Sequence, residues 1–143
     1  MTAQRVSLIT LGVADLDRSK AFYAANGWQP LPGPDGVVFY RMQGMALGLF
    51  GIDALAEDQG RRGETLGTGA MTLAQNFPDR AAVDAAFSRA LAAGGTELKR
   101  PEPVFWGGYS GYYADPDGHV WELAHNPFWT VNDDGSLTIP DPE

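Results

Sequence analysis

A single carboxylate stands in an otherwise apolar strand near the end of the chain. Glu122 follows the turn Asp-Pro-Asp-Gly at residues 115–118, and strand alternation puts it on one face with Val120 and Ala124. Burying an unpaired carboxylate is costly, so we expect Glu122 to face a polar cavity, a cation, a hydrogen-bond donor or solvent. In a cavity it could accept hydrogen bonds or act as a general base or acid. An exposed strand position is the simpler interpretation.

Composition excludes several classes of partner. The chain has 143 residues, of which 44% are hydrophobic and 20% charged, as in ordinary globular domains. Its formal charge of −8 argues against nucleic acid and anionic membranes as partners. There is no Cys, which excludes disulfides and thiolate metal sites. Because we find neither an apolar leader nor a run long enough to span a bilayer, we expect a cytoplasmic protein.

The hydrophobic pattern predicts an α+β fold of two modules, each with the order strand, helix, strand, strand, strand. Module one is expected over 5–58, a glycine-rich linker over 59–69, module two over 70–125 and a tail over 126–143. In module one we expect strands over 5–13, 28–31, 37–41 and 45–50, a helix over 16–25 that Asp15 caps, and a helical turn over 52–58. In module two we expect strands over 70–77 and 96–99, a helix over 80–93, an irregular loop over 100–103 and the hairpin that carries Glu122.

The tail contains enough apolar residues to pack on its own module or on a second subunit, with a turn at residues 133–135. Each module alone leaves one sheet face uncovered. We therefore expect the two modules to form a curved mixed sheet around a cleft, with the helices outside.

Three stretches resemble the vicinal oxygen chelate superfamily, which includes glyoxalase I, bleomycin resistance proteins and extradiol dioxygenases. They are LITLGVADLDRSKAFYAANGW at 8–28, MTLAQNFPD at 71–79 and GYYADPDGHVWEL at 111–123. The resemblance implies a glyoxalase-like pair of βαβββ modules and a homodimer. In the metalloenzymes of this family, His or Glu side chains from both modules hold a divalent metal ion in the cleft.

At the four positions where the resemblance implies metal ligands, this chain has Leu8, Gly48, Thr72 and Glu122. Only Glu122 is a strong ligand, whereas catalytic zinc generally needs three protein ligands. Alternation puts His119 and His125 on the face opposite Glu122. We therefore expect no metal cofactor. The alternative is one divalent ion that involves Glu122 and ligands aligned differently.

A small aromatic or hydrophobic molecule is the ligand that the remaining residues favour. The expected contacts are Thr10, Phe39, Phe50, Thr72, Asn76, Trp106, Tyr109, Tyr112 and Glu122, with further room left by Gly48. Aromatic residues at these positions could equally fill a core or a subunit interface.

Three functions are consistent with this pattern. The first is a metal-independent binding protein, as in the bleomycin-resistance branch. The second is an enzyme, either a metal-dependent lyase, isomerase or dioxygenase or one that uses Glu122 as a general base or acid. The third is a non-catalytic interaction protein.

Overall fold

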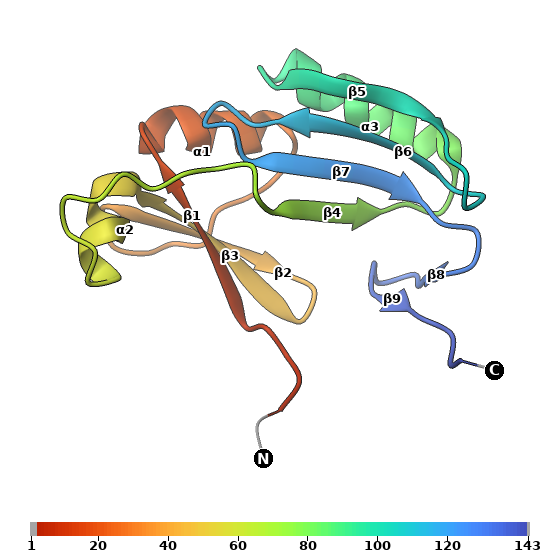
Figure 1. Cartoon of the computed structure of the whole chain (residues 1–143), viewed down its shortest axis with the longest axis horizontal. Helices are drawn as coiled ribbons and strands as arrows, with labels where there is room; N and C mark the ends of the chain where they lie inside the picture. Colours follow the sequence, from red (N-terminus) through yellow and green to blue (C-terminus); the bar gives the residue numbers. More distant parts are fainter. Residues whose placement is uncertain (1–2, 143) are drawn as a thin grey trace. The chain divides into compact units, whose positions relative to one another are not determined.

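The computed structural model describes residues 3–142, which divide into two compact units at the boundary between residues 67 and 68. Within the described residues, unit one, as we call it, combines two helices with a β-sheet, and unit two combines one helix with a β-sheet and a small hairpin (Figure 1). The α+β fold class expected from the sequence is confirmed. No helix in the described part of the chain has the length and apolarity needed to cross a membrane.

Unit one has a three-stranded sheet in the order β1-β3-β2. Its elements are β1 (Leu8–Val13), α1 (Leu16–Ala25), β2 (Val37–Met42), β3 (Met45–Gly51) and α2 (Ile52–Asp58). Strands β1 and β3 are parallel, and β2 and β3 are antiparallel. As expected, the Asp15 carboxylate caps α1 by accepting from Arg18 N at 3.0 Å.

The strand predicted over residues 28–31 is wrong. The segment makes one ladder-like bond, in which Leu31 N donates to Phe39 O at 2.8 Å, and it belongs to no sheet. Pro30 and Pro32 flank Leu31 and have no N–H to donate. The prolines therefore prevent the segment from continuing along the edge of β2.

The core of unit one lies between α1 and one face of the sheet. Leu11 and Leu49, neighbours in register, are 1% and 0% exposed. Tyr23 of α1 stacks on Trp28 with 5.1 Å between ring centroids, and Trp28 lies 5.7 Å from the Tyr40 ring. Residues that alternate with this buried set, among them Thr10 and Phe39, lie on the other face.

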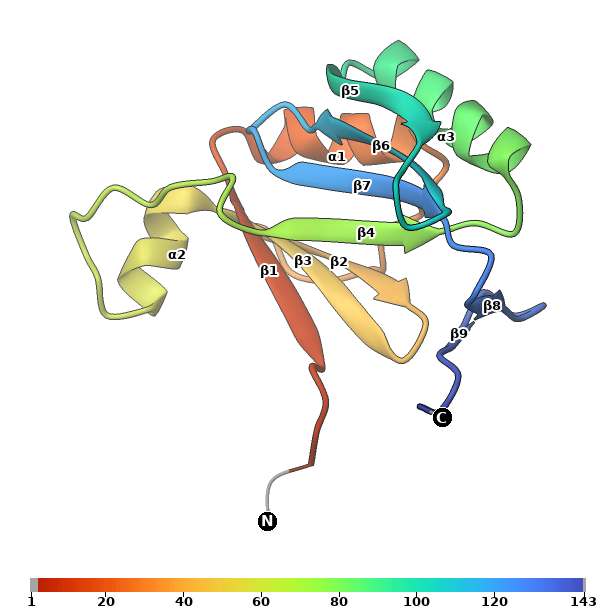
Figure 2. The same ribbon diagram turned by 45° about the vertical axis from the view of Figure 1, so that its right-hand side comes forward.

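Unit two has a four-stranded sheet in the order β4-β7-β6-β5. Its elements are β4 (Thr72–Asn76), α3 (Arg80–Ala92), β5 (Thr96–Pro103), β6 (Tyr109–Ala114) and β7 (Val120–His125). This is the βαβββ order expected for the second module. Helix α3 runs along one face of the sheet (Figure 1, Figure 2).

The irregular loop predicted over 100–103 is also wrong, because β5 continues through this segment. The register shifts between Glu97 and Lys99 and again between Lys99 and Glu102, so the strand absorbs its extra residues as bulges. Strand β5 lies at the edge of the sheet, where a missing proline N–H costs little. Pro101 packs so closely on Gly111 that a Cβ there would lie 2.7 Å from the proline nitrogen.

The turn between β6 and β7 is built around Asp115, which is 3% exposed. Its Oδ1 accepts from the backbone N–H groups of Asp117 and His119, both at 2.9 Å. Gly118 has φ +90°, a conformation that favours glycine. This turn fixes the start of β7 and with it the register of Glu122.

The tail of unit two forms a small antiparallel hairpin of β8 (Thr130–Val131) and β9 (Leu137–Thr138). The turn expected at residues 133–135 is present, since Asn132 N donates to Ser136 O at 2.8 Å. Before the hairpin, the Phe128 ring approaches Gly107, where a Cβ would lie 3.4 Å from it. The tail therefore contacts the β5–β6 loop of its own unit.

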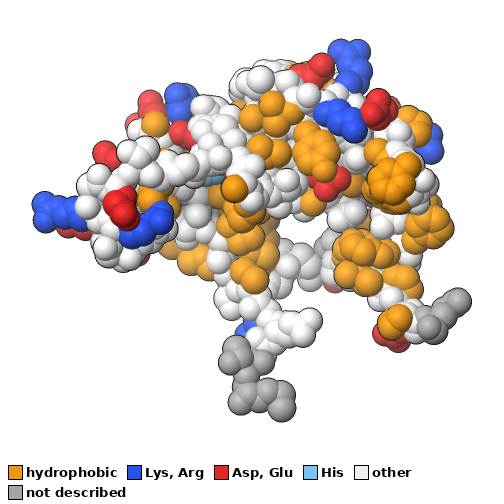
Figure 3. Space-filling model, in the orientation of Figure 1, with side chains coloured by type: hydrophobic (Ala, Val, Ile, Leu, Met, Phe, Trp, Pro, Cys, Tyr) orange, Lys and Arg blue, Asp and Glu red, His pale blue; other side chains and the backbone are white. Residues whose placement is uncertain are grey.

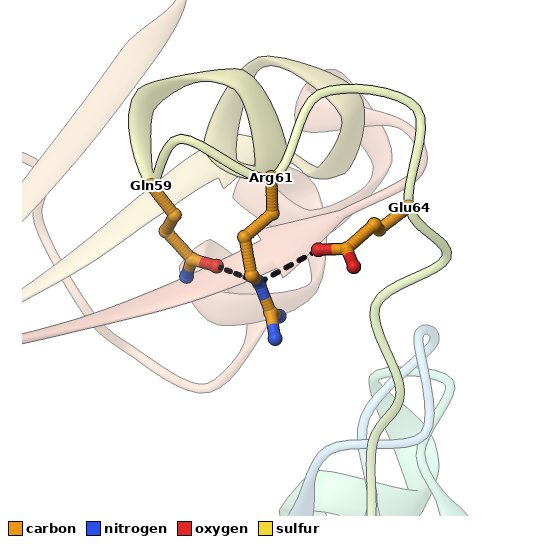
Figure 4. A network of polar contacts seen from close by, with 3 residues as sticks. All are labelled: Gln59, Arg61 and Glu64. Carbon is orange, nitrogen blue, oxygen red and sulfur yellow. Dashed lines mark hydrogen bonds and ion pairs between the residues drawn. The ribbon is translucent and has the colours of Figure 1, made fainter.

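Polar contacts near the end of unit one are confined to its surface. Arg61 Nε donates to Gln59 Oε1 at 2.9 Å and lies 3.6 Å from Glu64 Oε2 (Figure 4). The side chains of Arg61 and Glu64 are 52% and 62% exposed, so this ion pair contributes little to stability.

Candidate functional site

The face of the unit-two sheet opposite α3 carries Glu122. Tyr109 marks the helix side, because its hydroxyl donates to Asp84 Oδ1 of α3 at 2.7 Å. Alternation along β6 then places Ser110 and Tyr112 on the opposite side. Glu122 pairs in register with Tyr112 and therefore shares that side, which we call the Glu122 face.

Three strands contribute neighbouring residues to the centre of the Glu122 face. In register, Glu122 on β7 lies between Ala74 on β4 and Tyr112 on β6. Both Glu122 and Tyr112 are half-buried. Burial, the charge of Glu122 and a hydrogen bond between the two side chains all raise the pKa of Tyr112. The phenol therefore remains protonated at neutral pH and lies beside the Glu122 carboxylate in register.

Cations near Glu122 in unit two have other partners. Lys99 is the β5 residue in register with Tyr112, but its Nζ lies 3.2 Å from Glu102 Oε1. Arg100 contacts Glu97 at 3.4 Å. Among the ion pairs found within residues 3–142, none involves Glu122.

The polar residues predicted on β4 also lie on the Glu122 face. Thr72 is exposed and pairs with Val120, whereas Asn76 is half-buried and pairs with Ala124. Ser110, which the sequence analysis missed, is 4% exposed and pairs with Ala124 from the other side. Its even spacing from Tyr112 was the signal that could have identified it.

The neighbours in register in unit one that correspond to Ala74, Glu122 and Tyr112 include no carboxylate. Thr10 on β1, Gly48 on β3 and Phe39 on β2 are neighbours in register. A Cβ on Gly48 would lie 3.2 Å from Phe39 Cε1 and 3.4 Å from Thr10 Oγ1. The further room expected at Gly48 is therefore occupied by the Phe39 ring. Phe50, half-buried, lies on the same face two residues further along β3.

Tyr109 does not join the other predicted contacts. Besides its bond to Asp84, which raises the pKa of Tyr109, its ring lies under the Arg80 guanidinium at 5.1 Å. Tyr113 is likewise on the helix side, stacked against Trp121 with 6.5 Å between centroids. Both rings belong to the packing of the sheet on α3.

Trp106 lies in the β5–β6 loop and is 38% exposed. Its indole covers Gly108, where a Cβ would come within 1.9 Å of the ring. Phe105 beside it is fully exposed, and Phe128 in the tail is 65% exposed. Hydrophobic side chains gather on the surface of unit two around its C-terminal hairpin (Figure 3).

The residues at the positions implied for metal ligands do not fit a metal ion held in that way. Leu8 and Gly48 offer no donor atom, and a longer side chain at position 48 would meet the Phe39 ring. His125 lies on the helix side, with Nδ1 3.0 Å from Phe77 O. In the described range 3–142, no group of three or more His, Asp or Glu residues comes together in a way that could hold a metal.

Comparisons with known proteins agree with this architecture. Residues 5–123 match the family model described as the glyoxalase/bleomycin resistance protein/dioxygenase superfamily. A glyoxalase-related enzyme from Fulvimarina pelagi is 40% identical, with a TM-score of 0.90 over 97% of this chain and 100% of that one. A lactoylglutathione lyase from Agrobacterium tumefaciens is 25% identical, with a TM-score of 0.68 over 90% of this chain and 98% of that one.

Curated relatives are uncharacterized mycobacterial proteins. One from Mycobacterium bovis is 36% identical over 112 residues, covering 73% of this chain and 68% of its own length. Two from Mycobacterium tuberculosis show the same identity, and the match covers 61% of their length. With the family model matched over most of its length, the chain belongs to the glyoxalase/bleomycin resistance protein/dioxygenase superfamily.

Proposed function

We propose that this protein binds a small aromatic or hydrophobic molecule without the help of a metal ion. The observation that carries the proposal is the pair of Glu122 and Tyr112 on the face that α3 leaves uncovered. A half-buried carboxylate beside a protonated phenol presents an acceptor next to an aromatic ring. That combination orients a ligand by hydrogen bonding while the ring provides contact area.

The donor set supports binding without metal. Of the four implied ligand positions, Leu8 and Gly48 have no donor atom and Thr72 has only a hydroxyl. Ser110, Asn76 and Thr72 supply further hydrogen-bonding groups on the Glu122 face.

A thermal-shift screen of aromatic compounds tests the proposal. A ligand that binds only the native state raises the melting temperature in a saturable way. Glu122→Ala should abolish or strongly weaken this protection. Glu57→Ala, which removes an exposed carboxylate of α2 in unit one, is the matched control and should retain it. A screen with no saturable protection, or protection that persists in Glu122→Ala, contradicts the proposal.

A metal-dependent enzyme is the second candidate, favoured by the 40% identity to a protein described as a glyoxalase-related enzyme. Elemental analysis of untagged protein, followed by titration with Zn²⁺, Mn²⁺, Ni²⁺ and Fe²⁺, separates the two candidates. Stoichiometric metal that is lost in Glu122→Ala would establish a metal site that includes Glu122, favour the metal-dependent enzyme and overturn our first choice. Metal at background levels supports the organic ligand alone.

A homodimer belongs to the same proposal. The exposed apolar side chains Phe105, Phe128 and Ile139 of unit two favour contact with a second copy. Light scattering measures the mass directly, and the monomer mass of 15.4 kDa at micromolar concentration would contradict pairing.

A further inference from the structure

The carboxylate of Glu122 retains capacity for another partner. A carboxylate offers about four lone-pair sites, and the Tyr112 phenol, its neighbour in register on β6, can use only one of them. On its other side the neighbour in register is Ala74, whose methyl group makes no hydrogen bond. The β4 side of the Glu122 carboxylate is therefore where a ligand group can approach.

The negative charge of Glu122 indicates that its partner would be a cation. A half-buried carboxylate is stabilised best by a cation, yet Lys99 and Arg100 pair with Glu102 and Glu97 instead. A neutral donor such as the phenol compensates the charge only in part, since hydrogen bonds to charged donors are roughly twice as strong. The protein leaves this carboxylate without a counter-ion among residues 3–142.

We propose that the ligand of the Glu122 face is an aromatic cation, with Glu122 as its counter-ion and the Tyr112 ring beside the positive charge. This inference rests on the function proposed above and specifies its ligand class. The formal charge of −8 favours the approach of cations over anions at long range. An aromatic ring next to the ammonium group adds a cation–π contribution.

Three probes that share a naphthalene ring system and differ in their head group test whether the ligand must be positively charged. Calorimetric titration at pH 7 and low salt would use 1-naphthylmethylamine, 1-naphthylmethanol and 1-naphthoate. The amine should bind at least about tenfold more tightly than the alcohol, which corresponds to about 1.4 kcal/mol, and the carboxylate should bind most weakly. Raising the salt concentration should weaken the amine more than the alcohol.

Two isosteric variants locate the effect. Glu122→Gln should weaken the amine about tenfold and leave the alcohol within about twofold, so that the preference disappears. Glu57→Gln changes the net charge by the same amount at an exposed position of α2 in unit one. It should leave the preference intact. The melting temperature of each variant reports whether it is folded.

The outcomes separate this inference from the proposed function. If the alcohol and the carboxylate bind as tightly as the amine, the inference is overturned while ligand binding stands. A preference for the amine that survives in Glu122→Gln also overturns it. If none of the three probes binds saturably, the inference fails, and absence of protection across the wider aromatic screen then rejects the proposed function too.

Discussion

Each unit contains an equivalent β-hairpin, β2–β3 in unit one and β6–β7 in unit two, and the two hairpins carry different residues at one equivalent position. Four residues after the glycine of the turn, unit one has Gly48 after Gly44 and unit two has Glu122 after Gly118. The next residue is a buried leucine in both cases, Leu49 and Leu123. The buried leucine is therefore shared, whereas the residue before it, on the opposite face of the sheet, differs completely in chemistry.

This difference shows that two copies of the same backbone arrangement can carry different chemistry at an equivalent position. In unit one the absence of a side chain at Gly48 lets the Phe39 ring lie close to the sheet. In unit two the same position projects a carboxylate toward a phenol. The same position thus has an apolar ring beside it in unit one and carries a carboxylate in unit two.

The equivalence of the two hairpins is tested by the two buried leucines. Leu49→Ala and Leu123→Ala should each lower the free energy of unfolding by about 2–5 kcal/mol, because both side chains are fully buried. Urea denaturation followed by circular dichroism measures the loss. Leu98→Ala, at a position 51% exposed, is the control and should cost under about 0.5 kcal/mol. A cost under about 1 kcal/mol in one unit alone would break the equivalence.

Exchanging the differing position should cost less. Gly48→Glu should destabilise the protein by about 1–3 kcal/mol, because a Cβ would lie 3.2 Å from the Phe39 ring. In a double-mutant cycle, Phe39→Ala should reduce the cost of Gly48→Glu, since it removes the opposing ring. Strict additivity of the two changes, measured by urea denaturation, would show that Phe39 does not limit this position.

Two tyrosines should respond to loss of the hydroxyl with opposite signs. Tyr112→Phe should lower stability by about 0.5–1.5 kcal/mol, because the half-buried Glu122 carboxylate loses the hydroxyl group of its neighbour in register. The Tyr40 hydroxyl in unit one is buried and has no hydrogen-bond partner within residues 3–142. Tyr40→Phe should therefore be neutral or raise stability by up to about 1 kcal/mol. Equal losses in thermal denaturation would indicate that the Tyr40 hydroxyl is satisfied in solution.

The smallest expected effect is the loss of stability at alkaline pH. Burial raises the pKa of Tyr113, with a further contribution from the charge of Asp115. Above the unfolded pKa of about 10, the unfolded chain loses this proton while the native state keeps it. The contribution of Tyr113 to stability should thus be constant below pH of about 10 and fall as pH rises further. Tyr113→Phe should make the decline shallower, and an unchanged slope would exclude Tyr113 as its source.

Local signals were sufficient to predict most elements. Asp15 and Asp79 each follow a strand and precede a helix. The Asp15 carboxylate caps α1 as expected, and Asp79 Oδ1 likewise caps α3 by accepting from Ala82 N at 2.7 Å. The errors occur where proline acts through its neighbours. Pro30 and Pro32 stop a strand that the pattern favoured, whereas Pro101 is accepted in β5 because that strand lies at an edge.

The candidate site was predictable in part. Strand alternation alone places Thr72, Asn76 and Glu122 together, and the same rule separates Tyr109 from Tyr112, although the prediction included both. The bond from Tyr109 to Asp84 depends on how α3 packs, which spacing does not reveal. The filling of the space at Gly48 by Phe39 likewise depends on register across β2 and β3. How these residues take part in binding stays a prediction.

The Trp106 indole lies over Gly108, so the residues at positions 106 and 108 depend on each other. While Trp106 keeps its place, every side chain at position 108 would collide with it, because even a Cβ would come within 1.9 Å. Replacement of Gly108 therefore displaces the indole, whose outer ring atoms make the overlap. Among descendants of this sequence, we expect the residues at the two positions to vary together.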